Sequence, residues 1–380
     1  MRPSGFELWR LSIPLRGSFA HAASSRTSSD LVLVAVHDDE GRVGWGEALP
    51  RTYVTGEDLD TLFERDAPAL AQQWLAREAG DMDELTAMLR AALPTQRYGL
   101  SCFGAFELAL LDLGGQCWGR SIADVLGGIA REPLPAGIVI GFEVPTAKLE
   151  RHCGVLRYGK RRHIKMKVGA DDDIERMAIC ARVFGDLKIR IDANAAWSAD
   201  EAMTRLEALA RFPIASVEQP VAPDDLATMR RIRETLGLAV MADESICTAK
   251  DALRLIDAGA ADVFNIRVGK MGGVLAARAI CELSRTRGIA TSLGTMVGET
   301  GVLSVASEVF GRCVPGFDYL DGKGQSAFLL AEDILDPSTP DSGPPHSGPI
   351  SGPISGLGVR VSRDRVTKYA ISAPTRIGRV

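Results

Sequence analysis

Short β-rich runs alternate with helical stretches from Pro133 onward, and this alternation constrains the fold more than any other feature of the chain. The runs cover residues 137–141, 163–168, 188–192, 214–218, 238–242, 262–268 and 289–293. Helical stretches such as 198–211 and 249–258 lie between them, which is typical of a parallel sheet with crossover helices. Repeats of about 25 residues leave room for seven or eight such units, so the pattern predicts an α/β fold that closes into a barrel.

The N-terminal third of the chain shows a different pattern, in which strands are followed by helices. Residues 6–13 and 31–37 are strand-like, and the turn residues at 38–41 predict a hairpin. From about residue 58 to 128 the periodicity is helical, most clearly at 105–113. We therefore expect an α+β capping domain at residues 1–130 and a barrel domain at 131–325.

The C-terminal segment, 326–380, contains a Gly/Pro/Ser repeat at 342–356 that cannot pack a core. We expect this repeat to be a flexible surface insertion. The strand-like residues 358–362 predict that the chain then returns to the capping domain.

Composition and charge exclude several classes of function. Hydrophobic residues make up 46% and charged residues 24% of the chain, which is the profile of a globular enzyme. A net charge of −5 provides no electrostatic footprint for nucleic acid, and no apolar run is long enough to span a membrane. The seven cysteines contain no Cys-x-x-Cys pair, so we expect reduced thiols. Without an apolar signal core at its N-terminus, the chain is expected in the cytoplasm.

Two lysines share one face of the strand-like run 163–168. Because a strand alternates faces with period two, Lys165 and Lys167 point one way, and Ile164 and Met166 point the other. The apolar face meets the helices, so the lysines face the barrel interior. Cations at such a position are costly without a charge partner or a function.

Four further charged residues follow at intervals of about one βα unit: Asp192, Glu218, Asp243 and Arg267. Each occupies an equivalent place at the end of its strand, where barrel enzymes keep their active sites. Three converging carboxylates would repel one another, and a divalent cation that prefers oxygen ligands, such as Mg²⁺, resolves the repulsion. Such a cation can polarise a substrate carboxylate, and a nearby lysine with a lowered pKa can remove the adjacent proton.

The ordered motifs around these residues resemble those of the mandelate racemase/muconate-lactonising family of the enolase superfamily, in its muconate-lactonising branch. The motifs are HIKMKVG at 163–169, IDAN at 191–194, VEQP at 217–220, ADES at 242–245 and NIRVGKMGG at 265–273. GWGE at 44–47 and the helix at 105–113 resemble the capping domain of the same family. The resemblance therefore covers most of the chain and implies a modified TIM barrel, (β/α)7β, with an N-terminal α+β cap.

The resemblance also implies a set of roles. Asp192, Glu218 and Asp243 would bind one Mg²⁺ per subunit, Lys167 would be the base, and Lys165 would help to hold the substrate carboxylate. Glu244 competes with Asp243 as a ligand, but the motif favours Asp243. Cap loops at about 16–27 and 50–58 would close over the substrate, and the further candidates for substrate contact or support are His21, Tyr53, Asn194, Glu244, Glu299 and Asp321.

Two departures from the family pattern affect the expected reaction. Arg267 stands where most of this branch has a second catalytic lysine, and an arginine is a poor base but a good carboxylate ligand. Lys270 falls on the opposite strand parity and does not obviously replace it. Dipeptide epimerases of the family carry an Asp-x-Asp pair at the last strand that binds the substrate ammonium, whereas this chain has Tyr319 and Asp321. A substrate ammonium is therefore less expected, although Asp318 next door could compensate for the missing carboxylate.

These observations lead to one main hypothesis and two alternatives. The main hypothesis is Mg²⁺-dependent removal of the proton α to a carboxylate through an enediolate, followed by β-elimination or cycloisomerisation. The first alternative is a racemase or epimerase of an amino-acid derivative or dipeptide. The second is a catalytically inactive barrel that binds a small acid, which turnover would exclude. A Schiff-base aldolase would leave the carboxylates unexplained. The expected partners are a small-molecule carboxylate and further copies of the chain in a homo-oligomer.

Overall fold

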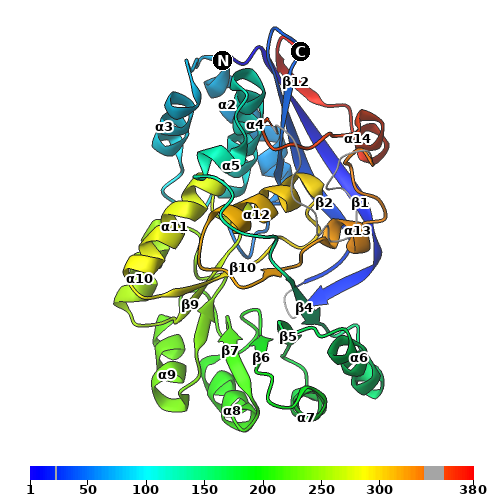
Figure 1. Cartoon of the computed structure of the whole chain (residues 1–380), viewed down its shortest axis with the longest axis vertical. Coiled ribbons are helices and arrows are strands. Elements are labelled where there is room, and N and C mark those ends of the chain that lie inside the picture. The colour runs from blue at the N-terminus through cyan, green and yellow to red at the C-terminus, as the bar shows by residue number, and fades with distance from the viewer. Residues whose placement is uncertain (22–23, 338–354) are drawn as a thin grey trace.

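A computed structural model describes residues 1–21, 24–337 and 355–380. Figure 1 shows a layer of helices and antiparallel strands above a barrel, with both termini at the far end of that layer. Positions 342–354 of the expected Gly/Pro/Ser insertion lie outside the described residues. The two residues of that repeat that are described, 355 and 356, lie against the capping layer, where Gly356 forms a bridge with Ser121.

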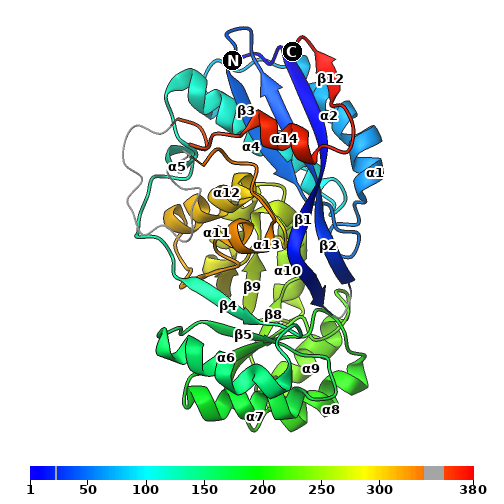
Figure 2. The same ribbon diagram turned by 90° about the vertical axis from the view of Figure 1, so that its right-hand side faces the viewer.

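Four antiparallel strands form the sheet of the capping layer, in the order β12-β1-β2-β3. The strands are β1 (Gly5–His21), β2 (Ser24–His37), β3 (Val43–Ala48) and β12 (Thr375–Gly378). The expected loop at 16–27 is instead largely paired strand, since Phe19 pairs with Arg26 and His21 with Ser24. Figure 2 shows the dark-blue tips of β1 and β2 reaching down toward the barrel.

The chain was expected to return to the capping domain with the strand-like residues 358–362. Val361 instead forms an antiparallel bridge with Leu335, and the strand that joins the sheet is β12, which pairs with the start of β1. The intervening helix α14 (Arg363–Tyr369) is tied to the 333–335 segment, because Arg365 donates to the carbonyls of Asp333 and Leu335. The strand that joins the capping sheet therefore lies further along the chain than the strand-like residues 358–362.

The cap helices cover one side of the sheet, and the longest of them is almost wholly buried. The helices are α1 (Leu59–Thr61), η1 (Leu62–Asp66), α2 (Ala67–Leu75), α3 (Met82–Ala92), α4 (Leu100–Trp118) and α5 (Ile122–Val125). The backbone of α4 passes directly over β3, where a Cβ on Gly46 would lie 1.9 Å from the carbonyl oxygen of Ala105. The glycines of the GWGE motif therefore allow helix and strand to touch.

Eight parallel strands close the barrel in the order β10-β11-β4-β5-β6-β7-β8-β9. The strands are β4 (Ala136–Ile140), β5 (Ile164–Lys167), β6 (Ile189–Asp192), β7 (Ile214–Glu218), β8 (Val240–Ala242), β9 (Val263–Ile266), β10 (Ala290–Leu293) and β11 (Leu320–Asp321). The helices are α6 (Thr146–Tyr158), α7 (Asp173–Phe184), α8 (Ala199–Leu209), α9 (Leu226–Leu236), α10 (Ala249–Asp257), η2 (Val268–Lys270), α11 (Val274–Thr286), α12 (Gly301–Cys313) and α13 (Gln325–Leu329). An α-helix follows each of the first seven strands, with η2 preceding α11 after β9, so the expected (β/α)7β barrel with an N-terminal cap is confirmed.

Two buried carboxylates of the cap join it to the barrel by accepting hydrogen bonds at helix N-termini. Glu107 of α4 accepts from the backbone N–H groups of Val274 and Leu275, at 2.7 and 2.9 Å, where α11 begins. Glu47 of β3 accepts from the backbone and side chain of Thr300, at 2.8 and 2.6 Å, where α12 begins. The first N–H groups of a helix have no partner within the helix, so each carboxylate supplies acceptors that the barrel lacks.

The glycine that precedes α11 should be sensitive to substitution for this reason. Gly273 has φ +105°, and a Cβ there would lie 1.8 Å from Oε2 of Glu107. We expect Gly273→Ala to lower the free energy of unfolding by about 3 kcal/mol, from backbone strain and from displaced buried hydrogen bonds. Gly288→Ala is the matched control, because Gly288 has φ +70° with open space around it, at the other end of α11. Urea denaturation should show a loss of only about 1 kcal/mol for the control; equal losses would contradict the role given to Glu107.

All seven cysteines are free, and all but Cys117 are buried, which agrees with the expected reduced thiols. Among the described residues, no helix has the length and apolar character needed to cross a bilayer.

Candidate active site

The five charged residues that lie about one βα unit apart in the sequence converge at the carboxyl end of the barrel. Lys167, Asp192 and Glu218 are the last residues of β5, β6 and β7. Asp243 directly follows β8, and Arg267 directly follows β9. The three carboxylates are at most 1% exposed, so the structure brings them together in one buried ring.

Lys165 lies at the centre of this ring and contacts three carboxylates. Its Nζ is 3.1 Å from Glu218, 3.2 Å from Asp192 and 3.3 Å from Asp321. Burial alone would lower the pKa of Lys165, but the three carboxylates outweigh burial and raise it above its ordinary value. Lys165 is therefore a fixed cation and unsuited to act as a base.

Lys167 has fewer partners and points into an open space. Its Nζ donates to Oδ2 of Asp192 at 2.7 Å and to the side-chain oxygen of Asn194. Asn194, in the left-handed region at φ 47°, also donates to Oε1 of Glu244 at 3.3 Å. The turn after β6 thus holds Asn194 so that its amide orients the lysine.

Arg267 faces Lys167 from the opposite side of the barrel, since three strands separate β5 from β9 in either direction. Its guanidinium contacts Asp243 and lies 3.6 Å from Oε1 of Glu218. Burial would lower the pKa of Arg267, but Asp243 and Glu218 raise it, so the guanidinium stays protonated.

Lys270 lies nearby despite its strand parity. Its Nζ donates to the carbonyl and the carboxylate of Asp243, at 2.5 and 2.6 Å, and the residue is fully buried. The alternation of side chains along a strand does not apply to Lys270, because β9 ends at Ile266 and residues 268–270 form the short helix η2. Lys270 therefore holds Asp243 and does not line the cavity.

The carboxylates of the ring differ in their acidity. Burial raises the pKa of Glu218, and the neighbouring charge of Asp192 raises it further. Burial would also raise the pKa of Asp192, but Lys167 and Lys165 lower it below its ordinary value. Burial and the charge of Asp243 raise the pKa of Glu244 to about 7. The negative charges of the ring are therefore unevenly compensated. The carboxylates of Glu218 and Glu244 are the least stabilised by neighbouring cations.

The donor set suits a hard divalent cation. Within the described ranges, no three His, Cys, Asp or Glu side chains are arranged as a metal-binding group, and the carboxylates are paired with lysine and arginine instead. Oε2 of Glu244 is nevertheless buried without a hydrogen-bond partner, and every candidate ligand is an oxygen. Five cationic side chains, Lys165, Lys167, Arg190, Arg267 and Lys270, face five carboxylates, Asp192, Glu218, Asp243, Glu244 and Asp321. An added divalent cation would leave a net positive charge that matches an anionic substrate, so these residues fit Mg²⁺.

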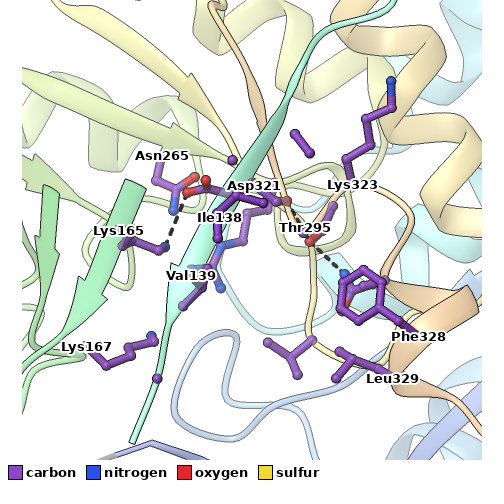
Figure 3. A pocket seen from close by; sticks show the side chains of 18 of the residues that line it. Ile138, Val139, Lys165, Lys167, Asn265, Thr295, Asp321, Lys323, Phe328 and Leu329 are labelled. Carbon is purple, nitrogen blue, oxygen red and sulfur yellow. Dashed lines mark hydrogen bonds and ion pairs between the residues drawn. The ribbon is translucent and has the colours of Figure 1, made fainter. Parts of the chain in front are cut away.

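A cavity of about 400 Å³ opens beside the two facing cations. Figure 3 shows Lys165 and Lys167 pointing into it from β5, with Asn265 and Asp321 beside Lys165. Arg267 and Thr295 also line it, and Phe328 and Leu329 of α13 line its outer part. The cavity is large enough for a small organic acid.

The remaining residues singled out from the sequence lie in other environments. Glu299 is buried away from the cavity lining, where it accepts from the N–H of Met296 and the hydroxyl of Ser304, both at 2.9 Å. Tyr53 is 37% exposed in the cap. His21 ends β1, and its side chain lies outside the described residues. Neither Glu299 nor Tyr53 is among the described residues that line the cavity.

Asp321 lines the cavity, but a residue without a predicted role already neutralises it. Arg190 of β6 binds Asp321 through both carboxylate oxygens, at 2.7 and 2.8 Å, and lies 4.2 Å from the ring centre of Tyr319. Asn265 was missed as well, and it donates to Oε1 of Glu218 at 2.8 Å. Period two could have indicated both, since Arg190 shares a face with Asp192 and Asn265 shares one with Arg267.

Comparison with known proteins follows the same division of the chain. The family model described as mandelate racemase/muconate lactonizing enzyme, N-terminal domain, matches residues 7–127, and the enolase C-terminal domain-like model matches 149–365. A hydrophobic dipeptide epimerase from Enterococcus faecalis is 31% identical over 298 residues, covering 76% of this chain and 81% of that protein. An o-succinylbenzoate synthase from Geobacillus stearothermophilus is 30% identical over 369 residues, covering 95% and 94%. A crystal structure of a dipeptide epimerase from E. faecalis, complexed with Mg and L-Leu-L-Tyr, superposes with a TM-score of 0.81 at 26% identity, covering 95% and 100%.

Proposed function

The chain belongs to the mandelate racemase/muconate lactonizing enzyme family of the enolase superfamily, and we propose that this enzyme removes the proton α to the carboxylate of an amino-acid derivative and returns it with inversion. The observation that carries the proposal is that Lys167 and Arg267 line one cavity from opposite strands of the barrel. A planar deprotonated substrate between them would expose one face to each. Relatives named as epimerases support this outcome over the elimination first expected from the sequence.

In this proposal Lys167 is the base and its neighbours prepare it. The proton moves from the substrate α-carbon to Nζ of Lys167, which must first be neutral, while Asn194 and Asp192 hold that nitrogen in place. Lys165 balances the negative charge that develops on the substrate carboxylate. Arg267 gives a proton to the opposite face of the α-carbon, which completes inversion, and the enzyme is reset when Lys167 releases its proton to solvent and Arg267 takes one up. Mg²⁺ held by Asp192, Glu218 and Asp243 would act as a Lewis acid toward that carboxylate. One Mg²⁺ per subunit, the muconate-lactonising branch and a homo-oligomer stay predictions.

The substrate nitrogen in this proposal is an amide and not a free ammonium. A free ammonium would need a carboxylate near the α-carbon, and the cavity-lining Asp321 is already bound by Arg190 and Lys165. Breaking that buried pair would leave an uncompensated buried charge, which is costly. An N-acylated amino acid meets the requirement.

A second candidate is a one-base elimination of a β-substituent, and Arg267 favours it. A guanidinium that stays protonated cannot take a proton from the second face, although it can stabilise negative charge there. An o-succinylbenzoate synthase among the relatives also supports this second candidate.

Proton exchange in D₂O should test the proposal and separate the two candidates. Both enantiomers of a series of N-acylated amino acids and dipeptides would be incubated with enzyme and Mg²⁺ and followed by mass spectrometry and chiral chromatography. We expect one enantiomer to gain deuterium rapidly, with slower inversion, and EDTA to abolish both. Loss of water or of another β-substituent without inversion would favour the second candidate. Exchange unaffected by EDTA would contradict the metal-dependent mechanism.

A further inference from the structure

The cavity is lined by a polar and charged group of residues and by an apolar group, and the apolar group has no role in the proposed chemistry. The polar and charged group is Lys165, Lys167, Asn265, Arg267 and Asp321. The apolar group, which we call the wall, is Ile138, Val139, Val297, Phe328 and Leu329; Val139 is in register with Lys165 on the neighbouring strand. Resting on the proposed function, we infer that the acyl group on the substrate nitrogen is apolar and uncharged, and that this wall selects it.

Two described charged residues line the cavity near the wall, and neither suits a second carboxylate. Lys323 contributes its stem, while its Nζ is turned away and held by the carbonyl of Leu134 at 2.8 Å and by Glu308 at 2.7 Å. Figure 3 shows this ammonium pointing away from the labelled wall residues. Glu143 is exposed and has no ion-pair partner among the described residues. An acyl group that ends in a carboxylate would therefore meet repulsion without a compensating cation.

Hydrogen bonds hold helix α13, which carries Phe328 and Leu329 of the wall, in place, although Phe328 is open to solvent. Phe328 is 59% exposed at the end of α13. Gln325, in the first turn of this helix, donates to Thr295 and Met296 and accepts from Gly298 at 3.0 Å. These bonds tie α13 to the loop that carries Val297. Figure 3 shows Phe328 and Leu329 side by side there, so an apolar group would gain contact with little cost in ordering the protein.

Calorimetric titration of the full chain with ligands, in the presence of Mg²⁺, tests the inference by binding alone and without turnover. The ligands are N-hexanoyl-, N-succinyl- and N-acetyl-2-aminoisobutyrate, which carry no α-proton; hexanoyl and succinyl match in non-hydrogen atoms. We expect the hexanoyl compound to bind about tenfold or more tightly than the succinyl compound. Phe328→Ala should weaken hexanoyl binding about tenfold and leave acetyl binding unchanged, and Phe328→Leu should restore most of the loss. Tyr158→Ala, at a 91% exposed aromatic on α6, is the control and should change neither.

The outcomes separate this inference from the proposed function. Equal binding of succinyl and hexanoyl compounds, alongside deuterium exchange of N-acylated amino acids, would overturn the inference alone. Preferential hexanoyl binding without exchange of any acylated amino acid would overturn the proposed function and leave the apolar subsite in place. If none of the three compounds binds and no acylated amino acid exchanges, both are wrong.

Discussion

Replacing Lys167 with alanine is expected to lower the rate of α-proton exchange by about 10⁴-fold, the upper range of a positioned general base. The site offers no substitute on that face. Lys165 is engaged by three carboxylates that raise its pKa, and Lys270 is fully buried against Asp243. Exchange in D₂O, followed by NMR at saturating Mg²⁺, should show this loss and leave only a slow residual rate.

Loss of folding could imitate this result, because Asp192 would lose a buried partner at 2.7 Å. Lys167→Arg keeps the cation beside Asp192 but supplies a poor base, so it should bind substrate and remain inactive. Lys148→Ala, at an exposed lysine of α6, should behave like the wild type. Substantial exchange in Lys167→Arg would remove Lys167 from the role of base.

Periodicity predicted the fold and the ring of charges because both follow from local rules. Strand alternation places Lys165 and Lys167 on one face, and a constant unit length places Asp192, Glu218 and Asp243 at equivalent heights. Each rule needs only neighbouring residues or a repeat length. The predicted strand runs at 163–168 and 214–218 accordingly coincide with β5 and β7.

Pairings across the barrel could not be predicted in this way. Arg190 and Asp321 belong to strands far apart in the chain, and their bidentate contact depends on how the barrel closes. Lys270 reaches Asp243 because a short helix replaces the strand, which parity cannot anticipate. The capping contact of Glu107 with α11 likewise depends on how two domains dock.

The apolar wall is the least predictable part of the site. Ile138 and Val139 come from the first barrel strand, and Phe328 and Leu329 come from a helix after the last one. The closed barrel makes these segments neighbours, since β11 pairs directly with β4. No spacing rule links them in the sequence, so substrate selection required the three-dimensional structure.

Replacing Arg267 with lysine is expected to raise the rate of inversion relative to exchange by about 100-fold, the lower range for a positioned acid or base. Arg267 occupies the face opposite Lys167, and its carboxylate neighbours keep it protonated. In the wild type, a proton can therefore return from the second face but is removed there with difficulty. A lysine releases its proton more readily than an arginine, so it can serve that face in both directions.

Chiral chromatography combined with deuterium content would measure inversion and exchange in the same sample. Arg267→Met is the matched control, because it fills similar space without a cation or a base and should gain no inversion. Comparing Arg267→Lys with Arg267→Met therefore distinguishes inversion from a one-base elimination. If Arg267→Lys gains no inversion and both variants lose exchange together, Arg267 acts only as a fixed positive charge, as a one-base elimination requires. If inversion rises in Arg267→Lys alone, the barrel already holds a substrate with both faces of its α-carbon in reach, and the arginine is what limits the second proton transfer.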